Sequence, residues 1–200
     1  MQRIIERSGV PYLGSAPYQS SVGMHKMLTK EQMKTLGIKL PSHMRATKEG
    51  VSDIDATIQV IGNLFGPEYI LKPMRGGSSI GNRRASGPQS LREELKQMFN
   101  QYEDILIEEF IDGKSITIGV IDNFRGEKFY TTPTVEVFLE SIDGNVFLAE
   151  KQAPALLTNE IKKEIARLAQ LIHDQLELSD LSRSDFIVTP KNEIYFLEVN

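Results

Sequence analysis

The last eighteen residues, 183–200, hold side chains that could bind a metal ion. Two runs rich in β-branched and aromatic residues flank a short polar segment, a pattern that predicts a β-hairpin. If the turn has two residues, Asp185 lies opposite Glu198. Arg183 then lies opposite Asn200, and all four side chains share one face. The other face is expected to supply a core of five apolar residues: Phe186, Val188, Tyr195, Leu197 and Val199. A turn one residue longer would move Glu198 to the opposite face.

Two carboxylates at opposed positions need a compensating positive charge. Their Cβ atoms would lie about 5 Å apart, and at an effective dielectric constant of about 20 they would repel by roughly 3 kcal/mol. Arg183 could compensate them in a structural ion pair. A divalent metal ion could do the same, because carboxylate and amide oxygens are the ligands that Mg²⁺ prefers, commonly together with substrate phosphates. The hairpin alone leaves both interpretations open.

A second candidate site lies where a glycine- and serine-rich loop follows a strand. Residues 69–73 read as a strand that ends at a proline, and the loop over 74–81 follows. Consecutive backbone N–H groups in such a loop can bind an anion, and Lys72 could add a positive charge at its mouth. The loop is not a P-loop, because Asn82 stands where that motif has lysine. Taken alone, it also fits an ordinary mobile surface turn.

Composition excludes several classes of function. The chain has 200 residues, 40% of them hydrophobic and 25% charged, as in soluble globular proteins. The net charge of −4 and the lack of a basic block argue against nucleic acid as the main partner. The absence of cysteine excludes disulfides, zinc–thiolate sites and a cysteine nucleophile. Since no stretch is long and apolar enough to span a bilayer, we expect no membrane partner and, by default, a cytoplasmic location.

Hydrophobic patterning predicts an α+β fold. The expected helices cover residues 2–9, a segment from Ser20 or Ser21 to Leu36, a segment opened by a Ser52–Asp55 capping box and ending near Phe65, 91–99 and 158–176. The expected strands cover 38–44, 69–73, 104–111, 115–121, 129–139 and the hairpin, with turns at 112–113 and 143–144 and a loop over 147–155. Strands that alternate with single helices and antiparallel hairpins indicate α+β sandwich subdomains.

Seven short segments are spread along nearly the whole chain. They are P-Y-L-G-S (11–15), H-K-M-L-T-K (25–30), L-K-P-M-R-G-G-S-S-I-G (71–81), I-L-I-E-E-F-I-D-G (105–113), A-E-K (149–151), R-S-D-F (183–186) and F-L-E-V-N (196–200). Each segment is a weak signal by itself. In this order and spacing, they resemble the ATP-grasp part of D-alanine–D-alanine ligases.

The resemblance implies a site for ATP, as co-substrate, and for two Mg²⁺ or Mn²⁺ ions. It implies two lysines on the nucleotide phosphates, a loop that closes over them, a segment that reads adenine, a lysine near the γ-phosphate and an arginine that stabilises an oxyanion. The implied catalytic residues are Arg183, Lys151 and Ser78; the implied nucleotide-binding residues are Lys26, Lys72, Gly77, Ser79, Glu108, Glu109 and Ile111; and the implied metal ligands are Asp185, Glu198 and Asn200.

The implied activity is an ATP-dependent ligation of two D-alanines through an acyl phosphate, for peptidoglycan precursor synthesis. The implied fold is an ATP-grasp, with nucleotide between antiparallel sheets. Residues 1–20 are expected to end an amino-terminal domain and linker, 21–110 to form a nucleotide-lid subdomain, and 111–200 a catalytic and metal subdomain. We expect a fragment of a longer chain that binds Mg-ATP without efficient ligation by itself, and the resemblance allows a homodimer.

Three positions differ from the family pattern. Gly76 and Ser115 stand where the family usually has glutamate, and Lys151 lacks the usual neighbouring tyrosine. These differences leave the second substrate open. The alternatives are therefore an ATP-grasp ligase that joins a different amino acid or hydroxy acid, and a non-catalytic ATP-binding module. Release of ADP on addition of D-alanine would separate catalysis from binding.

Overall fold

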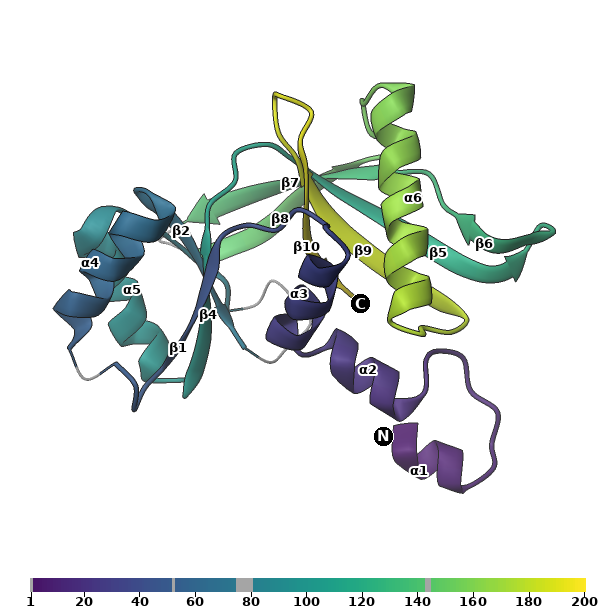
Figure 1. Cartoon of the computed structure of the whole chain (residues 1–200), viewed down its shortest axis with the longest axis horizontal. Helices are drawn as coiled ribbons and strands as arrows, with labels where there is room; N and C mark the ends of the chain where they lie inside the picture. The colour runs from purple at the N-terminus through teal and green to yellow at the C-terminus, as the bar shows by residue number, and fades with distance from the viewer. Residues whose placement is uncertain (1, 52, 75–80, 143–144) are drawn as a thin grey trace.

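The computed structural model describes the chain except for residues 1, 52, 75–80 and 143–144 (Figure 1). The helices are α1 (Gln2–Arg7), α2 (Pro17–Gly23), α3 (Lys26–Thr35), α4 (Ile54–Phe65), α5 (Gly87–Phe99) and α6 (Asn159–Gln175). The strands are β1 (His43–Thr47), β2 (Glu68–Pro73), β3 (Arg83–Ser86), β4 (Asp104–Glu109), β5 (Lys114–Phe124), β6 (Glu127–Thr131), β7 (Val135–Ile142), β8 (Asn145–Gln152), β9 (Leu181–Val188) and β10 (Ile194–Val199).

The strands form one antiparallel sheet with two parts. Its order is β1-β4-β2-β3-β8-β7-β5-β9-β10, with β6 paired to β5. The two parts meet where Arg83 of β3 pairs with Asn145 of β8. Figure 1 shows α4 and α5 beside the first part and α6 along the second. This arrangement confirms the predicted α+β class with antiparallel sheets.

Two separate hydrophobic cores stabilise these two parts. In the first core, α4 and α5 pack on β1, β2 and β4, and its fully buried members include Ile61, Leu91, Leu95, Ile105 and Ile107. In the second core, α6 packs on β5, β9 and β10, and its fully buried members include Ile116, Ile165, Ala169, Ile172, Phe186 and Phe196. Val22, Met33 and Ile38 also belong to the second core, so α2 and α3 pack with the later residues of the chain. The division at residue 110 stays a prediction.

The prediction of one helix from Ser20 or Ser21 to Leu36 is wrong, because the chain forms two helices there. His25 has an extended backbone (φ −99°, ψ 93°) between α2 and α3, and its Nδ1 accepts a hydrogen bond from the Leu28 N–H at 3.4 Å. A side chain that accepts from the first turn is an N-cap, so α3 begins at Lys26. The end of the helix agrees with expectation, since Gly37 has a positive φ of 71°.

The capping box expected for α4 is also wrong. Asp53 is the N-cap, and its Oδ1 accepts from the Asp55 N–H at 2.9 Å and the Ala56 N–H at 3.1 Å. Ser52 lies outside the described residues. An aspartate directly before the helix satisfies the same backbone donors that a serine would, and its charge favours the helix N-terminus.

Three of the strand predictions need correction. β1 begins at His43 rather than at residue 38, because Ile38 packs in the second core and the Lys39 carbonyl accepts from the Phe196 N–H at 2.9 Å. The strand expected over 129–139 is two strands, β6 and β7, separated around Pro133, which has no N–H for a ladder. The loop expected over 147–155 is mostly β8, which pairs with β7. The turn expected at 143–144 lies outside the described residues.

The C-terminal hairpin is confirmed, but its turn has three residues instead of two. Val188 pairs with Ile194, and the Thr189 N–H donates to the Glu193 carbonyl at 2.9 Å. This turn alone would move Glu198 to the other face. A β-bulge between Phe196 and Glu198 adds one more residue to β10 and restores the register.

Asp185 therefore lies opposite Glu198, as predicted. The three-residue turn also changes which side chains fill the core. Phe196, and not Tyr195 or Leu197, is fully buried, and its ring packs edge-on against Phe186 at a centroid distance of 5.8 Å.

Phe196→Ala tests this assignment of the core. We expect a loss of roughly 3–5 kcal/mol in the free energy of unfolding, because the substitution leaves a cavity against Phe186. Tyr195→Ala is the matched control and should cost clearly less, since Tyr195 is only half-buried. Urea titrations followed by circular dichroism measure both values. A larger loss for Tyr195→Ala would show that the core face has the register of a two-residue turn.

Candidate functional site

The bulged end of the hairpin gathers the four predicted polar residues. Arg183 donates from Nε and Nη2 to the two carboxylate oxygens of Asp185, at 3.1 and 3.0 Å. Asn200 Nδ2 donates to Asp185 Oδ2 at 3.3 Å, and Arg183 and Asn200 exchange backbone hydrogen bonds of 2.8 Å. Asp185 thus takes part in the ion pair that the sequence allowed, with Glu198 directly opposite on β10.

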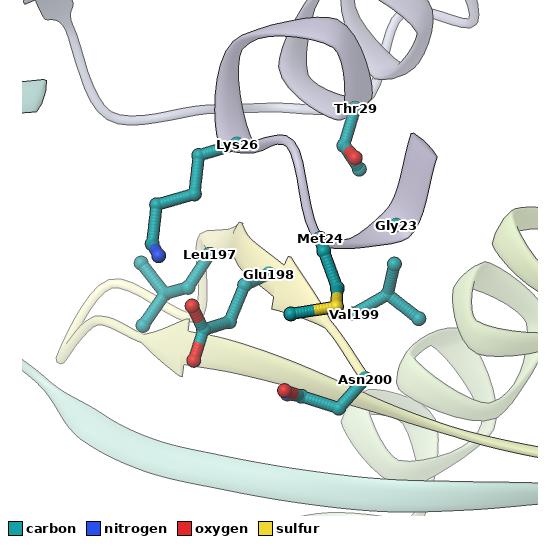
Figure 2. Close-up of a pocket in the computed structure, with 8 residues that line it drawn as sticks. All are labelled: Gly23, Met24, Lys26, Thr29, Leu197, Glu198, Val199 and Asn200. Atoms are coloured by element: carbon teal, nitrogen blue, oxygen red, sulfur yellow. The ribbon is translucent and has the colours of Figure 1, made fainter. Parts of the chain in front are cut away.

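A small pocket opens between this end of β10 and the start of α3 (Figure 2). Its lining residues are Gly23, Met24, Lys26, Thr29, Leu197, Glu198, Val199 and Asn200. Figure 2 shows the Lys26 and Glu198 side chains extending toward the same space. Burial lowers the pKa of Lys26, the charge of Glu198 opposes that shift, and the charge of Lys72 adds to it. The helix start that His25 caps therefore places a cation opposite a candidate metal ligand.

Two further lysines share one buried carboxylate beside this pocket. Glu108 of β4 is 1% exposed; its Oε1 lies 2.6 Å from Lys30 Nζ and its Oε2 lies 2.6 Å from Lys72 Nζ. The contact between Lys30 and Glu108 is an ion pair without hydrogen-bond geometry. Lys72 reaches the cluster from β2, the strand that pairs with β4. One carboxylate thus holds lysines from a helix and a neighbouring strand.

The pKa values in this cluster follow from burial and charge. Burial alone would raise the pKa of Glu108, but the two lysines outweigh it and lower that pKa to about 2. Burial lowers the pKa of Lys72, but Glu108 and Glu198 outweigh it, so the net shift is upward. For Lys30 the burial effect wins over Glu108 and the pKa is lowered. Lys72 is thus the lysine of this pair whose charged form the site favours.

Lys30 was missed in the sequence, although a signal for it existed. Glu108 interrupts a nearly continuous apolar strand, and a carboxylate in a buried strand needs a cationic partner. Lys30 stands one helical turn after Lys26 and therefore on the same face of α3. The buried Glu108 could have predicted that some cation contacts it. Only the tertiary structure shows that Lys30 and Lys72 are those cations.

The residues expected to read adenine lie at the end of β4. The Glu108 carboxylate is occupied by the two lysines. Glu109 accepts from the Ser42 N–H at 3.4 Å, and its own N–H donates to the Ser42 carbonyl at 2.8 Å. Ile111 is half-buried in the segment that leads to β5. Their role with adenine stays a prediction.

Lys151 lies on β8 rather than in a loop, and pairing places it on the face of Asp185. Lys151 pairs with Val137 of β7, and Val137 pairs with Ser115 of β5. Ser115 in turn pairs with Ile187 of β9, two residues from Asp185. Opposed residues share a face of the sheet. Three strand spacings of about 4.8 Å separate β8 from β9, so Lys151 stands roughly 14 Å away across the sheet. The structure brings Lys26, Lys72 and the hairpin residues together, with Lys151 at the far side of the same face.

The remaining predicted site residues, Gly77, Ser78 and Ser79, lie outside the described residues. Within the described ranges, no group of three or more histidine, cysteine, aspartate or glutamate residues could hold a metal ion. The predicted ligand set is of another kind, with two carboxylates and one amide. None of the helices that the structure describes is long and apolar enough to cross a membrane.

Comparison with known proteins gives concordant results. Residues 32–200 match the family model described as D-ala D-ala ligase C-terminus. The D-alanine–D-alanine ligases of Geobacter sulfurreducens and Aquifex aeolicus are 30% and 29% identical to the chain, which they match over its whole length. The chain spans 61% and 66% of these two relatives.

Solved structures of related ligases have the same fold as this chain. The VanG D-Ala:D-Ser ligase from Enterococcus faecalis superposes with a TM-score of 0.85 at 27% identity, covering all of this chain and 58% of that one. The D-alanyl-alanine synthetase A from Vibrio cholerae superposes with a TM-score of 0.84 at 25% identity, covering all of this chain and 61% of that one. The ATP-grasp fold expected from the sequence is confirmed.

Glu108→Gln tests the buried cluster through its pH dependence. Because the folded pKa of Glu108 is about 2, below its ordinary value of 4.5, its carboxylate stabilises the fold above pH 4.5. That contribution is lost as the pH falls toward 2. The variant should lose roughly 3–5 kcal/mol of unfolding free energy at pH 7, and its difference from the wild type should shrink between pH 4.5 and 2.

Glu103→Gln is the control for this titration. Glu103 is an exposed carboxylate 3.8 Å from Lys48, so its removal should change stability little at any pH. Urea titrations at a series of pH values measure all three proteins. A Glu108→Gln deficit that persists unchanged at pH 2 would contradict the ion-pair account.

Proposed function

The chain belongs to the family of D-alanine–D-alanine ligase C-terminal domains, and on that premise we propose that it binds ATP and divalent metal ions for the ligation of two D-alanines. In this proposal the carboxylate of one D-alanine attacks the γ-phosphate of ATP, which yields an acyl phosphate and ADP. The amine of the second D-alanine attacks the acyl carbon, and phosphate leaves. The product is a dipeptide of the kind used in peptidoglycan precursors.

One observation carries the proposal: cations and carboxylates from different elements lie close enough to act on one another electrostatically. Lys26 comes from α3, Lys72 from β2, and Asp185 and Glu198 from the hairpin. Glu198 contributes to the pKa shifts of both lysines, and Asp185 to that of Lys72. Lysines suit phosphates, but carboxylates repel them, so a site with both kinds of group fits a metal–nucleotide complex.

The donor set fits the metal ions that the family resemblance implies. Asp185 and Glu198 offer carboxylate oxygens on opposed positions of β9 and β10, and Asn200 offers an amide oxygen at the end of β10. These are hard oxygen ligands, as Mg²⁺ and Mn²⁺ prefer. Bound ions would reduce the repulsion between the phosphates and the attacking carboxylate. We propose these three residues as the metal ligands.

The other residues act by binding and orientation. Lys26 and Lys72 would hold nucleotide phosphates by charge-assisted hydrogen bonds. Arg183 has an exposed guanidinium, held by Asp185 through two of its N–H groups. Its remaining N–H groups would donate to the oxyanion that develops when the amine attacks. Lys151, at the far side of the same face, would approach the γ-phosphate, and the chemistry needs no covalent enzyme intermediate.

A ligase with another second substrate is the second candidate. The chain lacks a tyrosine beside Lys151, where Gln152 stands, and has Ser115 where the family usually has glutamate. A D-Ala:D-Ser ligase is among the solved structures that share this fold. Offering D-serine and D-lactate in place of the second D-alanine separates the two candidates. A non-catalytic ATP-binding module would show no amino-acid-dependent ADP release.

Lys72→Ala tests nucleotide binding by the chain. The variant should weaken Mg-ATP binding by roughly 1.5–3 kcal/mol, because it removes one charge-assisted contact to phosphate. Isothermal titration calorimetry measures the affinity, with Lys96→Ala, an exposed lysine on α5, as the control. Equal losses in the two variants, or no Mg-ATP binding by the folded wild type, would contradict the proposal.

Glu198→Gln tests the role of the hairpin in catalysis. In a ligase that carries these 200 residues, D-alanine-dependent phosphate release should fall by roughly 100-fold or more, because one metal ligand loses its charge. Glu127→Gln removes an exposed carboxylate of β6 and should leave the rate unchanged. A coupled assay for phosphate, with the dipeptide identified by mass spectrometry, measures both variants. A wild-type rate in Glu198→Gln would remove Glu198 from the site.

A further inference from the structure

Lys30 is one of the most deeply buried charged residues of the described structure, and the proposed mechanism does not use it. Its side chain is 1% exposed, whereas those of Lys72 and Glu108 are 8% and 2% exposed. Lysine is almost never fully buried unless it is paired. Because its ammonium group is enclosed, Lys30 cannot contact a phosphate without a rearrangement of α3. Any effect of Lys30 on nucleotide binding must therefore pass through a neighbour.

We propose that Lys30 is a positioning residue for Lys72 and acts through the carboxylate of Glu108 that the two lysines share. The inference rests on the proposed function in one respect, that Lys72 binds nucleotide phosphate. Glu108 holds Lys72 by its Oε2 and Lys30 by its Oε1, each at 2.6 Å. The position of the phosphate-binding ammonium group thus depends on where Glu108 is held, and Lys30 is its second anchor.

The charge balance gives Lys30 a second effect. Were Glu108 paired with Lys72 alone, the carboxylate would neutralise the cation that the phosphate needs. With Lys30 protonated, two ammonium groups and one carboxylate sum to a net charge of +1. Burial lowers the pKa of Lys30, and the charge of Glu108 opposes that shift. The upward shift in the pKa of Lys72 agrees with an ammonium group that stays charged despite burial. Lys30 thus allows Glu108 to anchor Lys72 without cancelling its charge.

The charged groups around Lys30 come from four elements. Lys26 stands one turn earlier on α3, Lys72 lies on β2 and Glu108 on β4, and the charge of Glu198 on β10 also acts on it. Met33, on the same helix, packs in the second core together with Val199 of β10. Helix α3 is therefore held to the hairpin by apolar contacts and to the first part of the sheet by the Lys30–Glu108 ion pair. This arrangement sets Lys26 and Lys72 relative to each other.

A double-mutant cycle distinguishes positioning through Glu108 from a merely structural role. Lys30→Met keeps an unbranched side chain, one atom shorter, but removes its charge and leaves Glu108 to neutralise Lys72. Mg-ATP affinity should fall roughly 10- to 100-fold, the effect of one lost charge-assisted contact. In Lys30→Met with Glu108→Gln, Lys72 is no longer neutralised but also no longer held by a carboxylate. The affinity should therefore recover in part, to a value between those of Lys30→Met and the wild type.

The matched control is Lys34→Met, the same substitution one turn later at an exposed position of α3. It should leave the affinity unchanged. Calorimetric titrations of the chain with Mg-ATP measure the affinities, and circular dichroism reports folding. If Lys30→Met alone fails to fold, the affinity of the double variant tests the inference, because that variant has no buried carboxylate at position 108. Affinity in the double variant as weak as in Lys72→Ala would overturn the inference, as would a wild-type affinity in a folded Lys30→Met.

A different result would contradict the proposed nucleotide-binding function than would contradict the role of Lys30. Titration of the wild type with inorganic tripolyphosphate and with Mg-ATP separates the two cases. Binding of both by the wild type, with no difference in Lys30→Met, overturns the role of Lys30 and leaves the nucleotide site standing. Binding of neither by the folded wild type overturns the phosphate-binding role of Lys72 and the inference with it.

Discussion

The ion pairs of Glu108 with Lys30 and Lys72 are the interaction on which the arrangement of the site depends. Moving three ionised groups out of water opposes folding, and their mutual attraction compensates only when the geometry is close. Here one carboxylate lies 2.6 Å from each of two ammonium groups, between a helix and two strands. Apolar residues of similar volume would often serve stability as well. The cluster is therefore best explained by the charge that it presents to the neighbouring pocket.

The second constraint is the register of the C-terminal hairpin. A three-residue turn and a β-bulge each shift the pairing by one residue, and together they return Glu198 to its place opposite Asp185. The register of the three-residue turn also places Phe196 opposite Phe186 in the core. The same two strands thus carry the candidate metal ligands on one face and core residues on the other. A single change in the turn or the bulge would move Glu198 away from the pocket.

Local patterns in the sequence predicted the elements whose residues interact mainly with near neighbours. Helix α6 and the strand before the glycine-rich loop could be read from spacing. The opposition of Asp185 and Glu198 was predicted from a two-residue turn, and it holds because a β-bulge offsets the three-residue turn. The misses came from distant interactions. β8 is a strand because it pairs with β7, and the break before α3 arises from capping by His25. The role of Lys30 becomes visible only in the fold, where β4 brings Glu108 beside it. Such contacts follow from the tertiary fold, which no local period encodes.

The most direct test of the account is a crystal structure of the chain with Mg²⁺ and a non-hydrolysable ATP analogue. The account predicts phosphate oxygens within hydrogen-bonding distance of Lys26 and Lys72, metal bound by Asp185, Glu198 and Asn200, and Lys30 still paired with Glu108. Nucleotide bound elsewhere on the chain, or metal that leaves the hairpin carboxylates uncoordinated, would contradict the account.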